Sequence, residues 1–516
     1  MPASSSRVLQ WLSLVGVIWL QSINGTNTNF PAYSSQLKHA LSMSQLQLNN
    51  LAFASDAGKL FGWFSGLAVA YLPLWLVLII GSTIGLVGYG FQYLSITNHI
   101  PTLSYWQVFC LTVLAGNSIC WINTVSYVVS IRNFPQNRQA AVGVTSSYQG
   151  LSAKIYTDVV GALFSSTKTA KGYLLLNSVL PLAVCVITSP FVRDIDDIQR
   201  LKNNHMDAGF VVLFVITIVT GVYSVISSLG LLVSSSALNN VIGTGVLLLV
   251  PLAIPVMAKI RELGLLEKWN LNRERRVCDF TIDEESNGIR VEEDHVIKGD
   301  IGVREEIGVK KMLVRLDFWL YFLVYFSGAT VGLVFLNNLG QIAESRGSSR
   351  TSSLVSLSSS FGFFGRLMPS LLDYHFSRRK YVVSRPALIA VLVAPMAGSF
   401  LLLLNSTNLS LYISTAIIGV CTGAITSISV STTQELFGDK NFSVNHNVLV
   451  VNIPIGSFVF GYFAALVYRR EGNGDGKCMG TECYEKTFLL WGFICSLGTV
   501  LAIVLYVRTR KFSSSR

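Results

Sequence analysis

The sequence predicts an all-α polytopic membrane protein. Of its 516 residues, 51% are hydrophobic and only 13% are charged, and the mean hydropathy is +0.52. A soluble protein has roughly twice that charged fraction, about 25%. The apolar residues form blocks of about 20, the length of helix that crosses a hydrocarbon core roughly 30 Å thick. The net charge of +11 does not indicate nucleic-acid binding, because the cations lie in short loops between apolar blocks.

One long polar segment, residues 259–313, divides the chain into two apolar parts. It mixes acidic and basic residues, contains few aromatic residues and shows no apolar period beyond Trp269. A segment of this composition cannot bury enough apolar surface to offset the entropy lost on ordering. We therefore expect a solvated, largely disordered cytoplasmic insert between two membrane bundles.

Fourteen apolar blocks are predicted to span the membrane as helices, and twelve is the alternative count. Residues 1–192 form an N-terminal six-helix bundle, which an extra helix pair within residues 193–258 extends to about residue 258. Residues 314–516 form the C-terminal six-helix bundle and a short tail. The predicted spans are 8–30, 46–70, 74–96, 105–131, 138–163, 172–192, 208–232, 237–258, 314–340, 350–372, 383–405, 410–435, 445–468 and 487–508.

The first block begins like a signal peptide, with Arg7 ahead of an apolar run. No small-residue cleavage site follows, so we expect this block to remain as the first helix. Short loops on the side of the N-terminus carry more Lys and Arg than loops on the other side, which marks the cytoplasmic face. Both termini and the insert are therefore predicted to be cytoplasmic. We expect the host membrane to be the plasma membrane or an endomembrane such as the vacuole.

The eight cysteines show no metal-ligand spacing, and we expect neither a metal nor another cofactor. Five lie in apolar blocks, where cysteine usually acts as a small buried hydrophobe. Cys478 and Cys483 share a short loop on the predicted non-cytoplasmic side, where a disulfide can form.

Polar side chains within apolar blocks need a structural or functional reason, because lipid offers them no partners. Asp56 and Lys59 are spaced i,i+3, and Lys154 and Asp158 are spaced i,i+4, so each pair can meet on one helix face. Such residues either satisfy one another between helices or line a solute pathway. The candidates for the pathway are Asn24, Asn27, Asp56, Lys59, Asn117, Asn123, Lys154, Asp158, Asn337 and Arg366.

An acidic residue at a predicted cytoplasmic helix end, Asp373, precedes the cations Arg378, Arg379 and Lys380. This arrangement suits a charge latch that breaks and forms as the two bundles move. Ordinary positive-inside anchoring of the loop is the alternative.

This stretch resembles the major facilitator signature G-x-L-x-D-R-x-G-R-R, with Pro369 in place of the glycine and a loop longer by one residue. Further stretches resemble the plant nodulin-like branch of that superfamily, which includes the nuclear fusion defective-type proteins. These are WLSLVGVIWLQSINGTNTNFPAYS, LPLW, VSIRNFPQNRQAAVGVTSSYQGLSAKIY and ELFGDKNFSVNHN. The resemblance covers nearly the whole chain and implies a two-bundle transporter fold. Distant kinship with monocarboxylate and oxalate/formate carriers implies a small organic anion as substrate.

We expect a monomeric secondary transporter that works by alternating access, with its site near mid-membrane between the bundles. Lys154 and Arg366 would attract a small organic anion such as a monocarboxylate, and Asp56 or Asp158 could carry a coupling proton. The alternative is a non-transporting receptor or scaffold that binds partners through its insert. An enzyme is not expected, because the sequence has no GxSxG motif, no phosphate loop and no grouped histidines.

Overall fold

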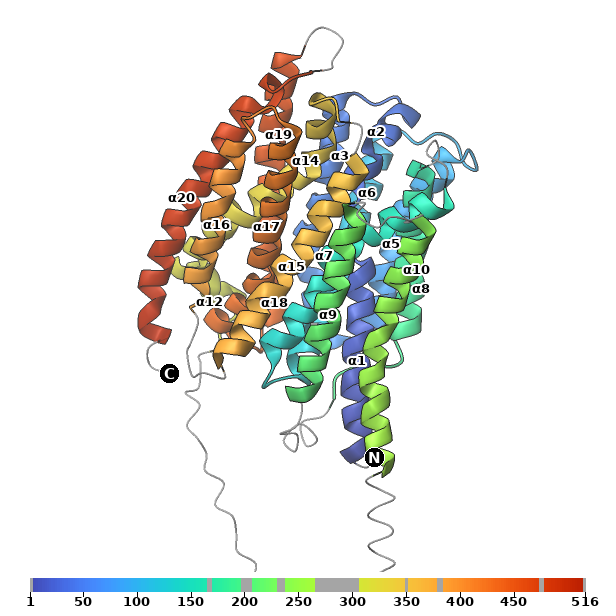
Figure 1. Ribbon diagram of the computed structural model, residues 1–516, viewed down its shortest axis with the longest axis vertical. Helices are drawn as coiled ribbons and strands as arrows, with labels where there is room; N and C mark the ends of the chain where they lie inside the picture. The colour runs from blue at the N-terminus through green and yellow to red at the C-terminus, as the bar shows by residue number, and fades with distance from the viewer. Residues whose placement is uncertain are drawn as a thin grey trace, which may run out of the picture.

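The computed structural model describes residues 3–164, 169–195, 207–229, 237–264, 306–348, 351–377, 384–472 and 478–513. These residues form helices and connecting loops, and none of them is in a strand. Most helices run side by side along one axis, with the N-terminal half in blue to green and the C-terminal half in yellow to red (Figure 1). Residues 265–305, most of the predicted insert, lie outside the described residues.

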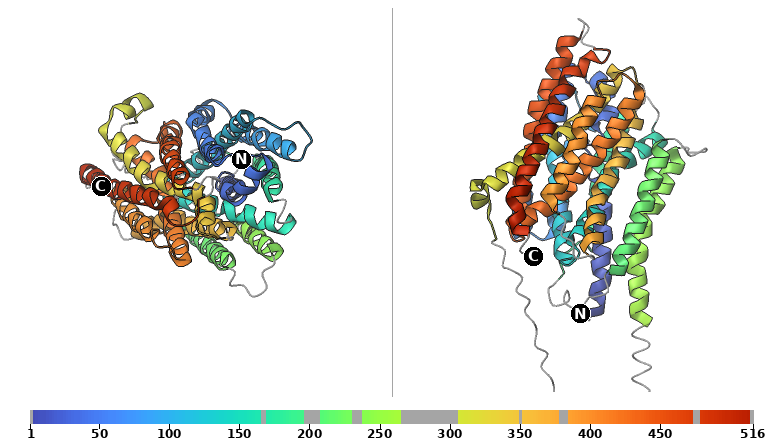
Figure 2. Two further views of the ribbon diagram at one scale, coloured as in Figure 1. Left: turned by 90° about the horizontal axis from the view of Figure 1, so that it is seen from above. Right: turned by 60° about the vertical axis from the view of Figure 1, so that its left-hand side comes forward.

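The N-terminal half comprises the helices up to α8, and the extra pair follows it. The helices of the half are α1 (Ala3–Ile23), α2 (Phe30–Ala40), α3 (Gln45–Ala57), η1 (Gly58–Phe61), α4 (Trp63–Tyr71), α5 (Leu74–Ile96), α6 (Tyr105–Asn133), α7 (Arg138–Leu163) and α8 (Thr169–Thr188). The extra pair consists of α9 (Asp207–Ser228) and α10 (Ala237–Leu249), which continues through η4 (Val250–Leu252) to Gly264. The pair packs at the periphery, α10 against α7 and α9 against α15 (Figure 2).

The C-terminal half begins with a short helix and includes one π-helical segment, η5. Its elements are α12 (Val309–Val314), α13 (Leu316–Tyr325), η5 (Phe326–Thr330), α14 (Val331–Ser345), α15 (Thr351–Ser377), α16 (Arg385–Leu402), α17 (Asn408–Phe437), α18 (Phe442–Val450), α19 (Asn452–Glu471) and α20 (Glu482–Ser513). Helical residues at 259–264 and 309–314 lie within the predicted insert, so both of its edges differ from the prediction. Good helix formers such as Glu262 extend the helix that begins at Ala237 to Gly264. At the other edge, the buried side chain of Met312 packs helix α12 against the protein.

The first predicted span is interrupted, which corrects the prediction of one helix over residues 8–30. Helix α1 ends at Ile23, and α2 begins only at Phe30. The intervening sequence, NGTNTN, consists of residues that compete with helical hydrogen bonds through their own side chains or lack a side chain. The Thr28 hydroxyl, for example, donates to the Gly25 carbonyl at 2.6 Å. The break places Asn27 and Thr28 where the two halves meet.

Ten helices among the described residues are long and apolar enough to cross a membrane, and the chain is an integral multi-pass membrane protein. The predicted spans outside these ten correspond to α1, α3 to α4, α7 and α15. Helices α7 and α15 contain many polar residues, which lower their mean hydropathy. They can carry these residues because they pack against each other between the halves. The total of fourteen spans stays a prediction.

Both chain termini and the helix ends that flank residues 265–305 lie at one end of the bundle (Figure 1). The start of α20, where Cys478 and Cys483 form a disulfide, lies at the opposite end. The assignment of the first end to the cytoplasm stays a prediction.

The two halves meet most closely where α7 crosses α15. A Cβ atom added at Gly150 would lie 2.7 Å from the backbone nitrogen of Phe363, closer than real contacts allow. Helices in lipid use small residues in this way to bring their backbones together.

We expect Gly150→Ala to lower thermal stability, because the Phe363 backbone cannot move aside as a flexible side chain can. Overpacking of this kind costs about 1–3 kcal/mol. The measurement is the melting temperature of the purified protein in detergent. Gly245→Ala on α10 is the matched control, because its Cβ meets nothing within 4 Å. Equal melting temperatures for the two variants would contradict this account of the interface.

Candidate substrate site between the two halves

A cavity of about 100 Å³ lies between the N-terminal and C-terminal halves. Its wall combines residues of the broken segment 24–29, η1, α6 and α7 with residues of α13 to α15 and α17 to α19. A second cavity of about 60 Å³ adjoins it. The residues that line both cavities are Asn27, Thr28, Gln149, Leu333 and Arg366.

Arg366 on α15 is the central charged group of this site. Its Nη1 atom donates a hydrogen bond to Oε1 of Gln149 on α7 at 2.9 Å. No carboxylate of the described residues lies within 4.0 Å of its guanidinium. The tyrosines Tyr127 and Tyr325 line the same cavity. A guanidinium without a carboxylate partner at this depth is costly unless an anion joins it.

Asp56 and Lys59 form an ion pair of 2.6 Å, as their spacing predicts. The second carboxylate oxygen of Asp56 accepts a hydrogen bond from Asn337 on α14 at 2.8 Å, which links the two halves. Lys59 lines the larger cavity, and Asp56 and Asn337 line the smaller one. Because Lys59 is neutralised by Asp56, the net positive charge of the wall comes from Arg366.

The four predicted amides of the N-terminal half divide into two pairs. Asn27 and Asn123 line the larger cavity. Asn24 donates to Oδ1 of Asn123 at 2.9 Å and to the Ile119 carbonyl at 3.2 Å. Asn117 donates to the Gly58 carbonyl and accepts from the Trp121 indole, both at 2.9 Å. Asn24 and Asn117 therefore hold elements against α6 and are not among the residues that line the two cavities.

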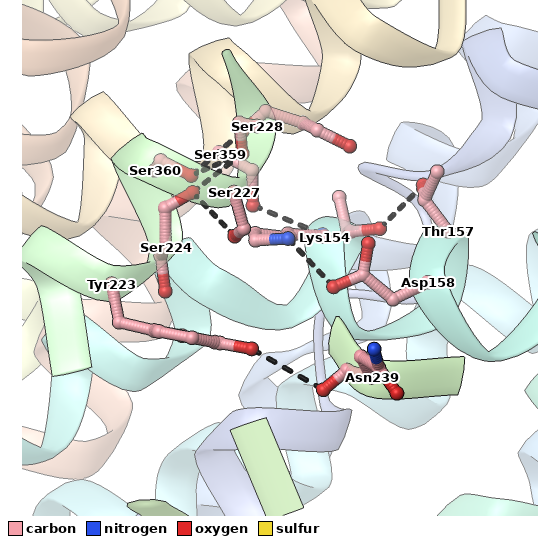
Figure 3. Close-up of polar contacts among 12 residues, drawn as sticks. Lys154, Thr157, Asp158, Tyr223, Ser224, Ser227, Ser228, Asn239, Ser359 and Ser360 are labelled. Atoms are coloured by element: carbon pink, nitrogen blue, oxygen red, sulfur yellow. Dashed lines mark hydrogen bonds and ion pairs between the residues drawn. The ribbon is translucent and has the colours of Figure 1, made fainter. Parts of the chain in front are cut away.

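Lys154 and Asp158 on α7 also pair, at 2.6 Å. They are not among the residues that line the two cavities. The pair instead faces serines of α9 and α15 (Figure 3). Lys154 therefore lies outside the two cavities that Arg366 lines, and the expectation that both cations attract one anion stays a prediction.

The predicted latch is described only in part. Asp373 lies near the end of α15, whereas Arg378, Arg379 and Lys380 lie outside the described residues. An ion pair that sequence reasoning missed joins the halves at this end, between Arg138 and Asp439 at 2.5 Å. Arg138 belongs to the RNFPQNR stretch and Asp439 to the ELFGDKN stretch. Both stretches carry the family resemblance, but the sequence alone does not show that they contact each other.

Several uncharged cavity residues were also missed, among them Gln149, His446 and Asn447. Asn447 on α18 donates to the Thr124 hydroxyl on α6 at 3.0 Å, another link between the halves. The available signal was the polar sequence SVNHN within an apolar block.

Contacts between the halves lie on both sides of the cavity along the long axis. Toward the α2 end, the Ser35 hydroxyl donates to the Glu344 carboxylate, and Asn337 donates to Asp56. Toward the other end, the Ser370 hydroxyl donates to the Gln139 carbonyl at 2.8 Å. The Arg138 ion pair lies at this second end.

Residues 10–256 match the family model described as Nodulin-like, and residues 300–515 match the model described as NFD4, C-terminal domain. The chain is 40% identical to the Protein NUCLEAR FUSION DEFECTIVE 4 of Arabidopsis thaliana, over 98% of this chain and 89% of that one. This similarity confirms the predicted family.

Two solved structures share the fold. One belongs to a study of proton-dependent oligopeptide transporters, with a TM-score of 0.54, 12% identity and coverage of 98% of this chain and 99% of that one. The other is the proton:xylose symporter XylE of the major facilitator superfamily, with a TM-score of 0.53, 10% identity and coverage of 96% and 95%. The chain belongs to the nodulin-like family, together with the Arabidopsis relative, and has the two-bundle fold of the major facilitator superfamily.

Proposed function

We propose that the chain is a secondary transporter of a small organic anion, and that Arg366 binds the anion between the two halves. The observation that supports this most is the guanidinium in the cavity wall, with no carboxylate of the described residues in ion-pair range. Monocarboxylates are the best candidates, because one carboxylate neutralises the single net charge that Arg366 adds to the wall.

The donors of Arg366 suit a carboxylate. A guanidinium has five N–H donors in a planar fork that can hold both carboxylate oxygens. One donor is engaged by Gln149, which orients the group. Around it the wall offers the hydroxyls of Thr426 and Ser429 and the apolar side chains of Leu333 and Ile453. This mixture suits a small solute that has one charged end and a short apolar body.

The two sets of contacts between the halves support alternating access. If the links near Asp56 and Glu344 break, the cavity opens toward the α2 end, and if the Arg138–Asp439 pair breaks, it opens toward the other end. Rocking of one bundle against the other around a central site is the usual motion of such carriers. The two solved relatives are transporters by title, and both titles name proton dependence, which supports a proton-coupled mechanism.

We expect Arg366→Gln to lower the uptake of labelled pyruvate, lactate and acetate into proteoliposomes. Loss of a charge-assisted hydrogen bond costs about 1.5–3 kcal/mol, which corresponds to roughly 10- to 150-fold in affinity. Arg366→Lys should retain part of the uptake, because it keeps the charge and loses the fork.

Lys486→Gln is the matched control for this measurement. It removes one positive charge from an exposed ion pair with Glu471 at the end of α19, away from the cavity. Uptake equal to wild type in a folded Arg366→Gln protein would refute the anion-binding role. Uptake of uncharged sugars or peptides alone would refute the proposed substrate class.

Deleting residues 275–305 should leave uptake unchanged, because the proposed site lies between the bundles. The same proteoliposome assay measures this, with melting temperature as a check on folding. Loss of uptake in a folded deletion variant would favour the alternative of a receptor or scaffold that acts through the insert.

A further inference from the structure

Lys154 and Asp158 form a second charged site, apart from the two central cavities. We propose that Asp158 binds a proton there, and that the extra helix pair α9–α10 encloses the site. The transport role of this proton rests on the proposed function, because the proton would move together with the anion. The proton site itself can be tested without transport.

The pair is well shielded. The Lys154 side chain is 1% exposed and the Asp158 side chain 12%, with 2.6 Å between Nζ and Oδ2. Lys154 lies one helical turn deeper than Asp158, which is close to the end of α7 at Leu163. Ion pairs are rare in membrane-spanning segments and usually mark an ion or proton pathway. Access from that end of the bundle reaches Asp158 first.

The wall around the pair is polar on the side of the extra helices (Figure 3). Ser228 on α9 and Ser360 on α15 are hydrogen-bonded at 3.0 Å between their hydroxyls. The Tyr223 hydroxyl on α9 donates to the Asn239 carbonyl on α10 at 3.3 Å. Serine and tyrosine hydroxyls both donate and accept, so they can pass a proton along.

On α10, Asn240 and Thr244 follow Ala237 by three and seven positions, so they lie on the same helix face as Ala237. A Cβ atom added at Gly161 on α7 would lie 3.7 Å from Ala237, at the start of α10. Because α7 and α10 run in opposite directions, Asn240 and Thr244 come next to the turns of α7 that carry Asp158 and Lys154. Thr244 is 4% exposed. Its Oγ1 atom and Oδ1 of Asn240 are buried and have no hydrogen-bond partner among the described residues. Buried orphan atoms of this kind usually indicate an ordered water, which can deliver a proton.

Asp158 is better suited to bind a proton than Asp56. Both oxygens of Asp56 are engaged, by Lys59 and by Asn337. Only Oδ2 of Asp158 accepts a hydrogen bond from the described residues, from Lys154. Its Oδ1 atom can therefore take a proton from hydronium, forming an O–H bond and releasing water.

Three ionisable groups interact with the Asp158 carboxylate: Lys154 on α7, Tyr173 on α8 and Tyr223 on α9. The parts of α1, α10 and α15 that face α7 at this level carry amide, hydroxyl and apolar side chains. Lys154 is the one cation of this set. Protonation of Asp158 therefore changes the net charge of the pair from zero to +1, because the charge of Lys154 is no longer balanced.

Ser359 connects this site to the substrate site. Its hydroxyl accepts from the Lys154 backbone N–H at 3.2 Å and donates to the Gly150 carbonyl, and it lines the smaller cavity. Through this contact the Lys154 backbone adjoins the smaller cavity, and we expect a net positive charge on the Lys154 side chain to favour an anion beside Arg366. By linkage, the anion must favour proton binding to Asp158 by the same factor.

The transport test compares two modes in proteoliposomes with labelled pyruvate. We expect Asp158→Asn to lose uptake driven by a pH gradient and to retain exchange of labelled for unlabelled pyruvate at equal pH. Asp317→Asn is the matched control, because it removes a carboxylate that pairs with Arg508 outside this site. Equal gradient-driven uptake in Asp158→Asn and wild type would overturn the proposal, and so would loss of exchange together with gradient-driven uptake.

Infrared titration of the protein in detergent tests the proton site without transport. We expect a protonated-carboxyl band on acidification that Asp158→Asn removes and Asp317→Asn keeps. Pyruvate should shift its midpoint to higher pH, by about one unit if the coupling is tenfold. A band that Asp158→Asn leaves unchanged would overturn the proposal. If this band is present while wild type transports none of the carboxylates, the proton site stands and the proposed transport function fails.

Discussion

The absence of water in the hydrocarbon core governs this structure. A polar group facing lipid has no partner and costs several kcal/mol, so polar side chains must meet one another between helices. Helices α7 and α15 carry many of them, and the two pack together between the halves. The Arg366–Gln149 contact and the Ser359–Gly150 contact both lie in this interface. The polar interface between α7 and α15 therefore joins the two halves and also forms part of the wall of the proposed site.

Broken helices extend the same constraint to the backbone. Segment 24–29, the 3₁₀ turn η1 and the π-helical segment η5 each interrupt a membrane helix. Asn27, Lys59 and Tyr325, which lie in or next to these breaks, line the larger cavity. Irregular backbone is tolerated at membrane depth where it is buried in protein or lines a cavity. The position of these three breaks beside a cavity inside the protein agrees with this rule.

The sequence pattern predicted the helices and the local ion pairs of this structure, but it did not predict the contacts between distant helices. The spans at 74–96 and 138–163 coincide with α5 and α7, because long apolar or periodic segments have few other conformations in lipid. Spacing also predicted the partners of Lys59 and Lys154, because residues three and four apart meet on one helix face. It could not show which pair lies at the central cavity. The Arg366–Gln149 contact joins positions 217 apart, and only the packing of the halves brings them together.

The two charged sites share one rigid element, and this shapes how they can act together. Gln149 and Lys154 lie on α7 five positions apart, the first bonded to Arg366 and the second to Asp158. A rotation of five residues at about 100° each places them on different faces, one toward the substrate cavity and one toward the extra helices. The Lys154–Asp158 pair lies wholly on α7 and moves with it. A shift of α7 would therefore change the Gln149–Arg366 contact and, at the same time, the surroundings of the pair on α9 and α15. Coupling between the sites then needs no chain of moving side chains, because one helix with two discrete positions is sufficient.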